Sequence, residues 1–307
     1  MKAIRVAQYG QFKGFVFEDL PSSVPGKGEV LIKVAGSGVN PVDWKVLSGV
    51  MKAFIPLKLP FTPGVEVAGR IMALGEGVST FSVGDEVFGF INIVGGYATE
   101  VVASADRLAH RPSRLSALQA SGVPAVSLTA WQALHEHAQI KAGQRVLIHG
   151  AAGGVGSIAV QLARIAGATV IATASAANHG YLQKLGASQL VDYTQTRFET
   201  VVEPVDVVLD LVGGETQTRS WAVLKPGGVL VSPVSPPDAN QAMAANAAGK
   251  HFATRSDAAQ LDNIAGLFET GELTIEVHVL PLSEAEEALR KSMGRHLRGK
   301  LVLDASL

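Results

Sequence analysis

The sequence of 307 residues contains no cysteine. Disulfide bonds, thiol nucleophiles and thiolate zinc ligands are therefore excluded. An excess of one charge is also absent, because 26 Lys and Arg residues against 27 Asp and Glu residues give a formal net charge of −1. Since the basic residues form no block either, we expect no nucleic-acid partner.

Long uninterrupted apolar runs are missing too. The stretch Val155–Ala177 is the richest in apolar residues, but Gln161, Arg164 and several glycines interrupt it. It fits a helix followed by a strand better than a membrane span. Residues Met1–Val6 alternate in polarity, which predicts a strand and not the apolar core of a signal peptide. We therefore expect a cytoplasmic enzyme with no membrane partner.

The first part of the chain has the pattern of a β domain. Hydrophobic residues make up 47% and charged residues 17% of the whole chain, which is typical of a globular protein. Short apolar runs separated by Gly-rich turns predict strands at Val30–Val34, Val65–Leu74, Gly84–Phe88 and Tyr97–Val102. This spacing is typical of a compact, barrel-like β domain.

The pattern changes near Ser121, where strands begin to alternate with helices. Helices are predicted at Ala125–His137, Val155–Ile165, His179–Leu185 and near Glu215–Leu224, and strands at Arg145–His149, Thr169–Thr173, Gln189–Val191, Val205–Leu209 and Gly228–Val231. Alternation of this kind predicts a doubly wound parallel sheet and places the chain in the α/β class.

The segment Val146–Gly156 combines an apolar strand, a loop of small residues and a helix start. Small residues let the backbone approach a pyrophosphate, and the N-terminus of a helix favours its negative charge. Ala151 stands at the first Gly position of the usual pattern. The alternative is a simple packing turn, but the strand–loop–helix context favours dinucleotide binding.

The end of the second strand bears on which nicotinamide cofactor binds. An NAD site usually offers an acid there, and Thr173–Asn178 contains none. Ser175, Asn178 and Tyr193 could donate hydrogen bonds to a 2′-phosphate, and His179 is the nearby candidate cation. These residues could also be loop polars without such a role. The pattern favours NADP(H).

Several ordered motifs resemble the medium-chain dehydrogenase/reductase superfamily, in its zinc-free quinone oxidoreductase and enone reductase branch. They cover nearly the whole chain: Gly38–Lys45, Pro63–Gly69, Gly75–Val78, Val83–Val87, Leu128–Trp131, Ala151–Gly156, Leu224–Gly228 and Arg298–Val302.

The resemblance implies a GroES-like catalytic domain over residues 1–121, completed by 273–307, and a Rossmann domain over 122–272. It also implies an active site in the cleft between the domains and a homo-oligomer, expected to be a dimer. Zinc-containing relatives carry Cys and His where Asn40 and Val65 stand here, so no catalytic metal is expected. His135 and His137 are read as helix surface.

Cofactor contacts follow from the resemblance by position. The expected set is Lys45, Thr129, Ala152, Gly153, Gly154, Val155, Ser175, Asn178, Tyr193, Ser232, Gly299 and Lys300. Ser232 also fits because it ends a predicted parallel strand, where ligands bind.

Asn40, Lys45 and Thr129 are the candidate catalytic residues, as donors to a carbonyl oxygen that gains negative charge. Each has an alternative: Asn40 could shape a turn, Lys45 could be a solvated lysine, and Thr129 could pack within its helix. Glu66 is expected in a structural ion pair, and Tyr97 in strand packing.

The expected function is zinc-independent hydride transfer from NADPH to a small apolar quinone or α,β-unsaturated carbonyl. Two alternatives stay open. One is an enoyl-thioester reductase, and the other is a non-catalytic NADPH-binding redox sensor.

Overall fold

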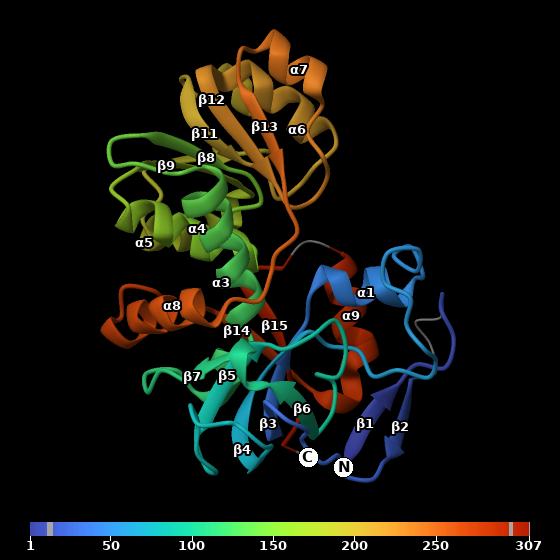
Figure 1. Ribbon diagram of the computed structural model, residues 1–307. Helices are drawn as coiled ribbons and strands as arrows, with labels where there is room; N and C mark the ends of the chain where they lie inside the picture. The colour runs from blue at the N-terminus through green and yellow to red at the C-terminus, as the bar shows by residue number, and fades with distance from the viewer. Residues whose placement is uncertain (11–14, 295–296, 307) are drawn as a thin grey trace. The chain divides into compact units, whose positions relative to one another are not determined.

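A computed structural model describes residues 1–10, 15–294 and 297–306. The chain divides into two compact units, shown in Figure 1. The first unit comprises Met1–Ala125, Ser256–Gly271 and Ile275–Leu307, and the second comprises Val126–Arg255 and Glu272–Thr274. The second unit is therefore inserted into the first in sequence. Residues 256–271 lie in the first unit, although the sequence prediction included them in the Rossmann domain.

The second unit is a six-stranded sheet with helices. Its elements are α3 (Pro124–Trp131), the π-helix η2 (Gln132–His137), β8 (Arg145–Ile148), α4 (Gly154–Ile165), β9 (Thr169–Ala174), α5 (His179–Leu185), β10 (Gln189–Asp192), β11 (Val205–Leu209), α6 (Glu215–Ser220), β12 (Leu224–Ser232), α7 (Ala239–Ala244) and β13 (Ala248–His251). The order β10-β9-β8-β11-β12-β13 is parallel throughout. The predicted doubly wound parallel sheet is thus confirmed.

The first unit is mostly antiparallel. Its elements are β1 (Lys2–Arg5), β2 (Val16–Asp19), β3 (Glu29–Gly38), α1 (Pro41–Leu47), β4 (Glu66–Leu74), β5 (Glu86–Phe90), β6 (Glu100–Ser104), β7 (Leu108–His110), α2 (Ala117–Ser121), α8 (Ala258–Thr270), β14 (Val277–Pro281), α9 (Ala285–Met293) and β15 (Lys300–Asp304). Its main sheet runs β14-β15-β3-β4-β5-β7, with β6 also paired to β3. The predicted β-rich domain is therefore confirmed.

The remaining one-turn segments are 3-10 helices. They are η1 (Ala105–Arg107), η3 (Ala176–Asn178), η4 (Phe198–Thr200), η5 (Trp221–Val223) and η6 (Leu282–Glu284). The η3 turn follows β9 directly and leads into α5, so it shapes one edge of the second unit's sheet.

The helix ends follow local chemistry. Pro41 occupies the first turn of α1, where its missing N–H costs nothing, so Asn40-Pro41 begins a helix and is not merely a turn. Both α5 and α8 end at a glycine with positive φ, Gly186 at 108° and Gly271 at 82°. Asp257 caps α8 by accepting a hydrogen bond from the Gln260 N–H at 3.0 Å.

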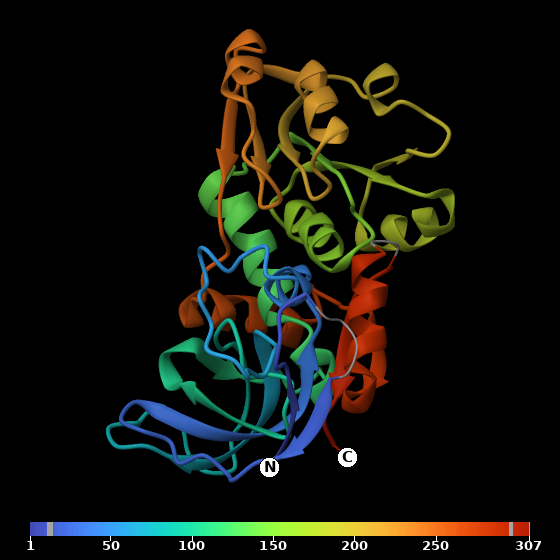
Figure 2. The same ribbon diagram turned by 90° about the vertical axis from the view of Figure 1, so that its right-hand side faces the viewer.

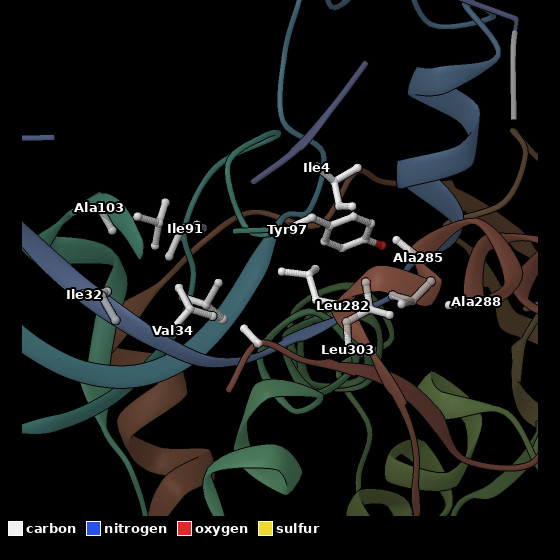
Figure 3. Close-up of a cluster of buried hydrophobic side chains, with 14 of the residues drawn as sticks. Ile4, Ile32, Val34, Ile91, Tyr97, Ala103, Leu282, Ala285, Ala288 and Leu303 are labelled. Atoms are coloured by element: carbon white, nitrogen blue, oxygen red, sulfur yellow. The ribbon is translucent and has the colours of Figure 1, made fainter. Parts of the chain in front are cut away.

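The core of the first unit unites segments from both ends of the chain. Figure 3 shows Ile4, Tyr97, Leu282 and Leu303 among its buried side chains. β15 pairs with β3, and α9 packs against β15 and α1. Figures 1 and 2 are both consistent with this arrangement. The C-terminal segment is therefore an integral part of this unit.

The core of the second unit is built from strands buried on both faces. Val146, Leu147 and Ile148 of β8 are fully buried, as the middle strand of a parallel sheet requires. Within the described residues, we find no helix long and apolar enough to cross a membrane.

Candidate functional site

The loop after β8 forms a backbone cradle at the start of α4. Gly153 precedes the helix and provides no capping side chain. The N–H groups of Gly154 and Val155 consequently have no partner among the described backbone bonds and can serve an anion. Gly156 is required sterically, because a Cβ there would lie 2.4 Å from the Gly150 carbonyl oxygen. This geometry fits a dinucleotide pyrophosphate.

The buried His149 lies directly before the cradle, just after the end of β8. The His149 ring bonds to the hydroxyls of Thr173 and Ser220, each at 3.0 Å. Ser220 donates its own proton to the Thr216 carbonyl at 2.7 Å, so it must accept from Nε2–H of His149. Burial lowers the pKa of His149 to about 4. A neutral imidazole therefore fixes the end of β8 to β9 and α6.

A buried aspartate organises the neighbouring strand ends. Asp210, directly after β11, accepts hydrogen bonds from the N–H groups of Val212 and Gly213 at 3.0 and 2.8 Å. Its second oxygen accepts from Gln217 and from the hydroxyl of Ser232, each at 3.0 Å. Ser232 thus lies at the carboxyl edge of the sheet, where the sequence placed it, and its hydroxyl is directed at Asp210.

The residues proposed for the adenosine end lie after β9 and β10. Asn178 donates to the Ser175 hydroxyl at 3.2 Å, so these two side chains are neighbours. Tyr193 directly follows β10 and is 54% exposed. His179 contacts the Ala174 carbonyl through Nε2 at 3.3 Å. These polar groups surround one sheet edge without a lysine or arginine among them.

The first unit contains a buried charged cluster of Asn40, Glu66 and Lys300, which we name the ammonium cluster. The Lys300 ammonium lies 2.8 Å from a Glu66 carboxylate oxygen and donates to Oδ1 of Asn40. Asn40 donates in turn to Glu66 at 2.7 Å, and the other Glu66 oxygen accepts the Ala125 N–H at 2.7 Å. Each charge is buried and paired, as burial demands. The predicted ion pair of Glu66 is confirmed.

Asp43 and Tyr97 form a second buried pair beside the ammonium cluster. One Asp43 oxygen accepts the Asn40 N–H at 2.7 Å and the Tyr97 hydroxyl at 2.9 Å. Burial raises the pKa of Asp43 to about 7, against the opposing effects of these hydrogen bonds and of Lys300. Tyr97 is fully buried in the core, so its predicted packing is confirmed, although it precedes β6 and does not lie in a strand.

The other candidate residues are Lys45, Thr129 and Gly299, of which Thr129 is buried. Lys45 is half-buried on α1, with its ammonium 5.8 Å from the centre of the Trp44 ring. Thr129 on α3 shares a hydrogen bond of 2.7 Å with Thr254. Gly299 has a φ of 69° and turns the chain into β15, directly before Lys300.

The positions at which zinc-containing relatives carry metal ligands hold other residues in this chain. Asn40 is bonded to the Lys300 ammonium, and Val65 is fully buried. His135 and His137 lie on the π-helix η2, where they contact the rings of Trp131 and Phe252. Across the described ranges, no three His, Asp or Glu residues are grouped as metal ligands would be.

The sequence interpretation missed two supports of these sites, His149 and Asp210. Their signal was present, since His149 ends the predicted strand Arg145–His149 and Asp210 directly follows the predicted strand Val205–Leu209. A polar residue at that position lies at the edge where ligands bind. Their partners Ser220 and Gln217 come from helix α6 and give no local signal.

Two family matches cover most of this architecture. Residues 26–113 match the alcohol dehydrogenase GroES-like domain, and residues 185–303 match a family described as zinc-binding dehydrogenase. A chloroplastic quinone oxidoreductase of Triphysaria versicolor is 33% identical over 99% of both chains. This chain belongs to the medium-chain dehydrogenase/reductase superfamily.

Solved structures of superfamily members agree with this membership. The quinone oxidoreductase of Coxiella burnetii has a TM-score of 0.91 and 35% identity, with 99% of each chain covered. The Escherichia coli quinone oxidoreductase complexed with NADPH has a TM-score of 0.91 and 25% identity, with 99% of this chain and 100% of that chain covered. The superfamily membership supports an oxidoreductase enzyme and matches both the β-rich unit and the parallel-sheet unit.

Proposed function

We propose that this protein is a zinc-independent, NADPH-dependent reductase of quinones or α,β-unsaturated carbonyls. The observation that carries the proposal is the backbone cradle between Gly150 and Gly156, where the uncapped N–H groups of α4 fit a pyrophosphate. The similarity to an NADPH-complexed quinone oxidoreductase supports this choice of cofactor.

The second unit would hold the cofactor. We propose that Ala152, Gly153, Gly154 and Val155 bind the pyrophosphate, and that Ser175, Asn178 and Tyr193 bind the adenosine phosphate. Ser232 lies at the carboxyl edge of the same sheet, beside Asp210. Thr129 is proposed to contact the nicotinamide end. When bound, NADPH supplies the hydride that the reduction requires.

The first unit would provide the charged hydrogen-bond donors for the substrate oxygen. The proposed donors are Lys45 and Lys300, and Gly299 directly precedes Lys300 at the start of β15. Asn40, the third candidate, accepts from the Lys300 ammonium. The Asn40 amide already donates to Glu66 at 2.7 Å and to the Gly38 carbonyl at 3.4 Å. Its part is therefore better described as positioning Lys300 than as donating directly. The ammonium has three hydrogens and two observed acceptors, which leaves one for a developing oxyanion.

The ammonium cluster supports the proposal of zinc independence. The Lys300 ammonium is bonded to Asn40, at the position where zinc-containing relatives have a cysteine. A divalent cation placed there would be repelled by this buried positive charge.

The test is oxidation of NADPH and of NADH by metal-stripped protein, against matched panels of quinones and alkenals. Activity with NADPH and either panel would support the proposal and choose the acceptor class. An enoyl-thioester acceptor in the same assay addresses that alternative. Tight NADPH binding without turnover on any acceptor would refute the catalytic proposal and favour a sensor.

The dimeric state and the cytoplasmic location stay predictions from the sequence. Light scattering of the purified protein and fractionation of the source cells test them.

A further inference from the structure

The adenosine end of the second unit has an acid that the second strand lacks. β10 runs parallel to β9, and Asp192 at the end of β10 is paired with Ala174 at the end of β9. Ser175 follows Ala174 directly, so Asp192 lies beside the loop assigned to the 2′ position of the cofactor. In a dinucleotide-binding fold this acid usually comes from the end of the second strand. Here the acid, Asp192, comes from the neighbouring strand β10.

The Asp192 carboxylate is held in place. One oxygen accepts the Thr194 N–H at 3.0 Å and the Thr194 hydroxyl at 2.7 Å. These bonds, together with His179 and the Ala176 N–H, keep the pKa of Asp192 below its usual range, although the group is open to solvent. Asp192 is therefore ionised at neutral pH.

No arginine or lysine forms an ion pair with Asp192 in the part of the chain that the structure describes. Asp192 takes part in none of the ion pairs found there, and His179 is the charged neighbour that lowers its pKa. The Ala176 N–H, which an incoming phosphate could use, already interacts with Asp192. A 2′-phosphate would approach a fixed negative charge, whereas a 2′-hydroxyl could donate to it.

We propose that Asp192 determines cofactor selection, by repelling the 2′-phosphate of NADPH and accepting a hydrogen bond from the 2′-hydroxyl of NADH. The protein then binds both cofactors, with a preference for NADPH of no more than about tenfold. This inference rests on the proposed function, because it concerns the same cofactor site.

The test is a binding measurement that needs no turnover. Dissociation constants for NADPH and NADH are determined by calorimetry for the wild type and for Asp192→Asn, which keeps the shape and the acceptor for Thr194. Glu203→Gln is the matched control, because Glu203 is an exposed acid of the same unit. Adenosine 2′,5′-bisphosphate and 5′-AMP are titrated in parallel to isolate the adenosine end.

Asp192→Asn is expected to raise the preference for NADPH over NADH about tenfold, and more at low salt. The two adenosine fragments should show the same shift, and Glu203→Gln should change the preference less than twofold. An unchanged preference in Asp192→Asn, with both cofactors still bound, would overturn the inference and leave the proposed function intact. If the wild type bound neither cofactor, both would be overturned.

Discussion

The two units present their candidate residues to ligands in opposite ways. In the second unit the cradle before α4 consists of backbone N–H groups and small residues, and Gly153 provides no capping side chain. In the first unit the candidates Asn40 and Lys300 are held by buried charges. The geometry of the candidate site therefore depends on small residues without capping side chains in the second unit. In the first unit it depends on the pairing of buried charges.

The comparison predicts different responses to mutation. A change in the ammonium cluster should act mainly on folding, since a buried charge without its partner is costly. A change in the backbone cradle should weaken cofactor binding as well as stability.

Lys300→Met leaves the buried Glu66 carboxyl without its ammonium partner. We expect a loss of about 3–5 kcal/mol in the free energy of unfolding, measured by urea denaturation. Lys291→Met is the control, because Lys291 is exposed and its pair with Glu287 spans 3.6 Å; its loss should stay below about 0.5 kcal/mol. The double variant Glu66→Gln/Lys300→Met should recover part of the loss. Equal, small losses in both single variants would contradict the prediction.

Gly156→Ala places a methyl group 2.4 Å from the Gly150 carbonyl oxygen and 2.6 Å from Cα of Ala151. These are backbone atoms, so the loop itself must move. We expect a destabilisation of about 2 kcal/mol and NADPH binding weakened more than about tenfold. Calorimetric titration with NADPH measures this weakening.

Gly180→Ala is the control for that variant. Gly180 lies in α5, and a Cβ there would meet nothing within 4 Å. An alanine in an open helical position should stabilise the protein slightly. Similar behaviour of the two variants would show that the cradle tolerates a side chain.

Asp43 predicts a pH dependence of stability. Its pKa is raised from 3.8 to about 7 in the folded protein, so the unfolded chain releases this proton first as pH rises. The folded state then binds more protons than the unfolded state, and stability contributed by this group falls between pH 4 and pH 7. The slope is at most about 1.4 kcal/mol per pH unit.

The variant Asp43→Asn should lack this component. Unfolding free energies of the wild type and the variant, measured from pH 4 to pH 8, give the difference directly. A difference that stays constant across this range would show that Asp43 does not retain its proton in the folded protein.

Ser175→Ala is expected to have the smallest effect. It removes one neutral donor from the adenosine end, so NADPH should bind about threefold to tenfold more weakly. NADH, which has no 2′-phosphate, is the internal control and should bind as before. An equal loss for both cofactors would place Ser175 elsewhere than at the 2′ position.

The same contrast explains what could be predicted from the sequence. The strand Arg145–Ile148, the glycine loop and α4 are contiguous, and their pattern is dictated by local sterics. The partnership of Asn40 and Lys300 links residues 260 positions apart, which no local pattern reports. Glu66 could be read as a member of an ion pair, but its partner could not be named.

Some elements of the fold also escaped sequence interpretation. The helix α8 is rich in alanine and has a weak apolar stripe, and β13 is a four-residue strand with mostly exposed side chains. Neither carries a strong periodic signal. The helix α1 was hidden because Asn40-Pro41 is equally typical of a turn and of a helix start.

The position of Lys300 in the chain has a consequence for biosynthesis. A ribosome completes the second unit, which ends at Thr274, before it adds the lysine on which Glu66 and Asn40 depend. Translation of the first unit starts before that of the second unit and ends after it. Its main sheet is complete only when β15 has been synthesised and pairs with β3. Until β15 has been translated, the second unit is complete but the first unit still lacks its C-terminal strand. Chaperones would therefore meet the N-terminal part of the first unit before it can fold.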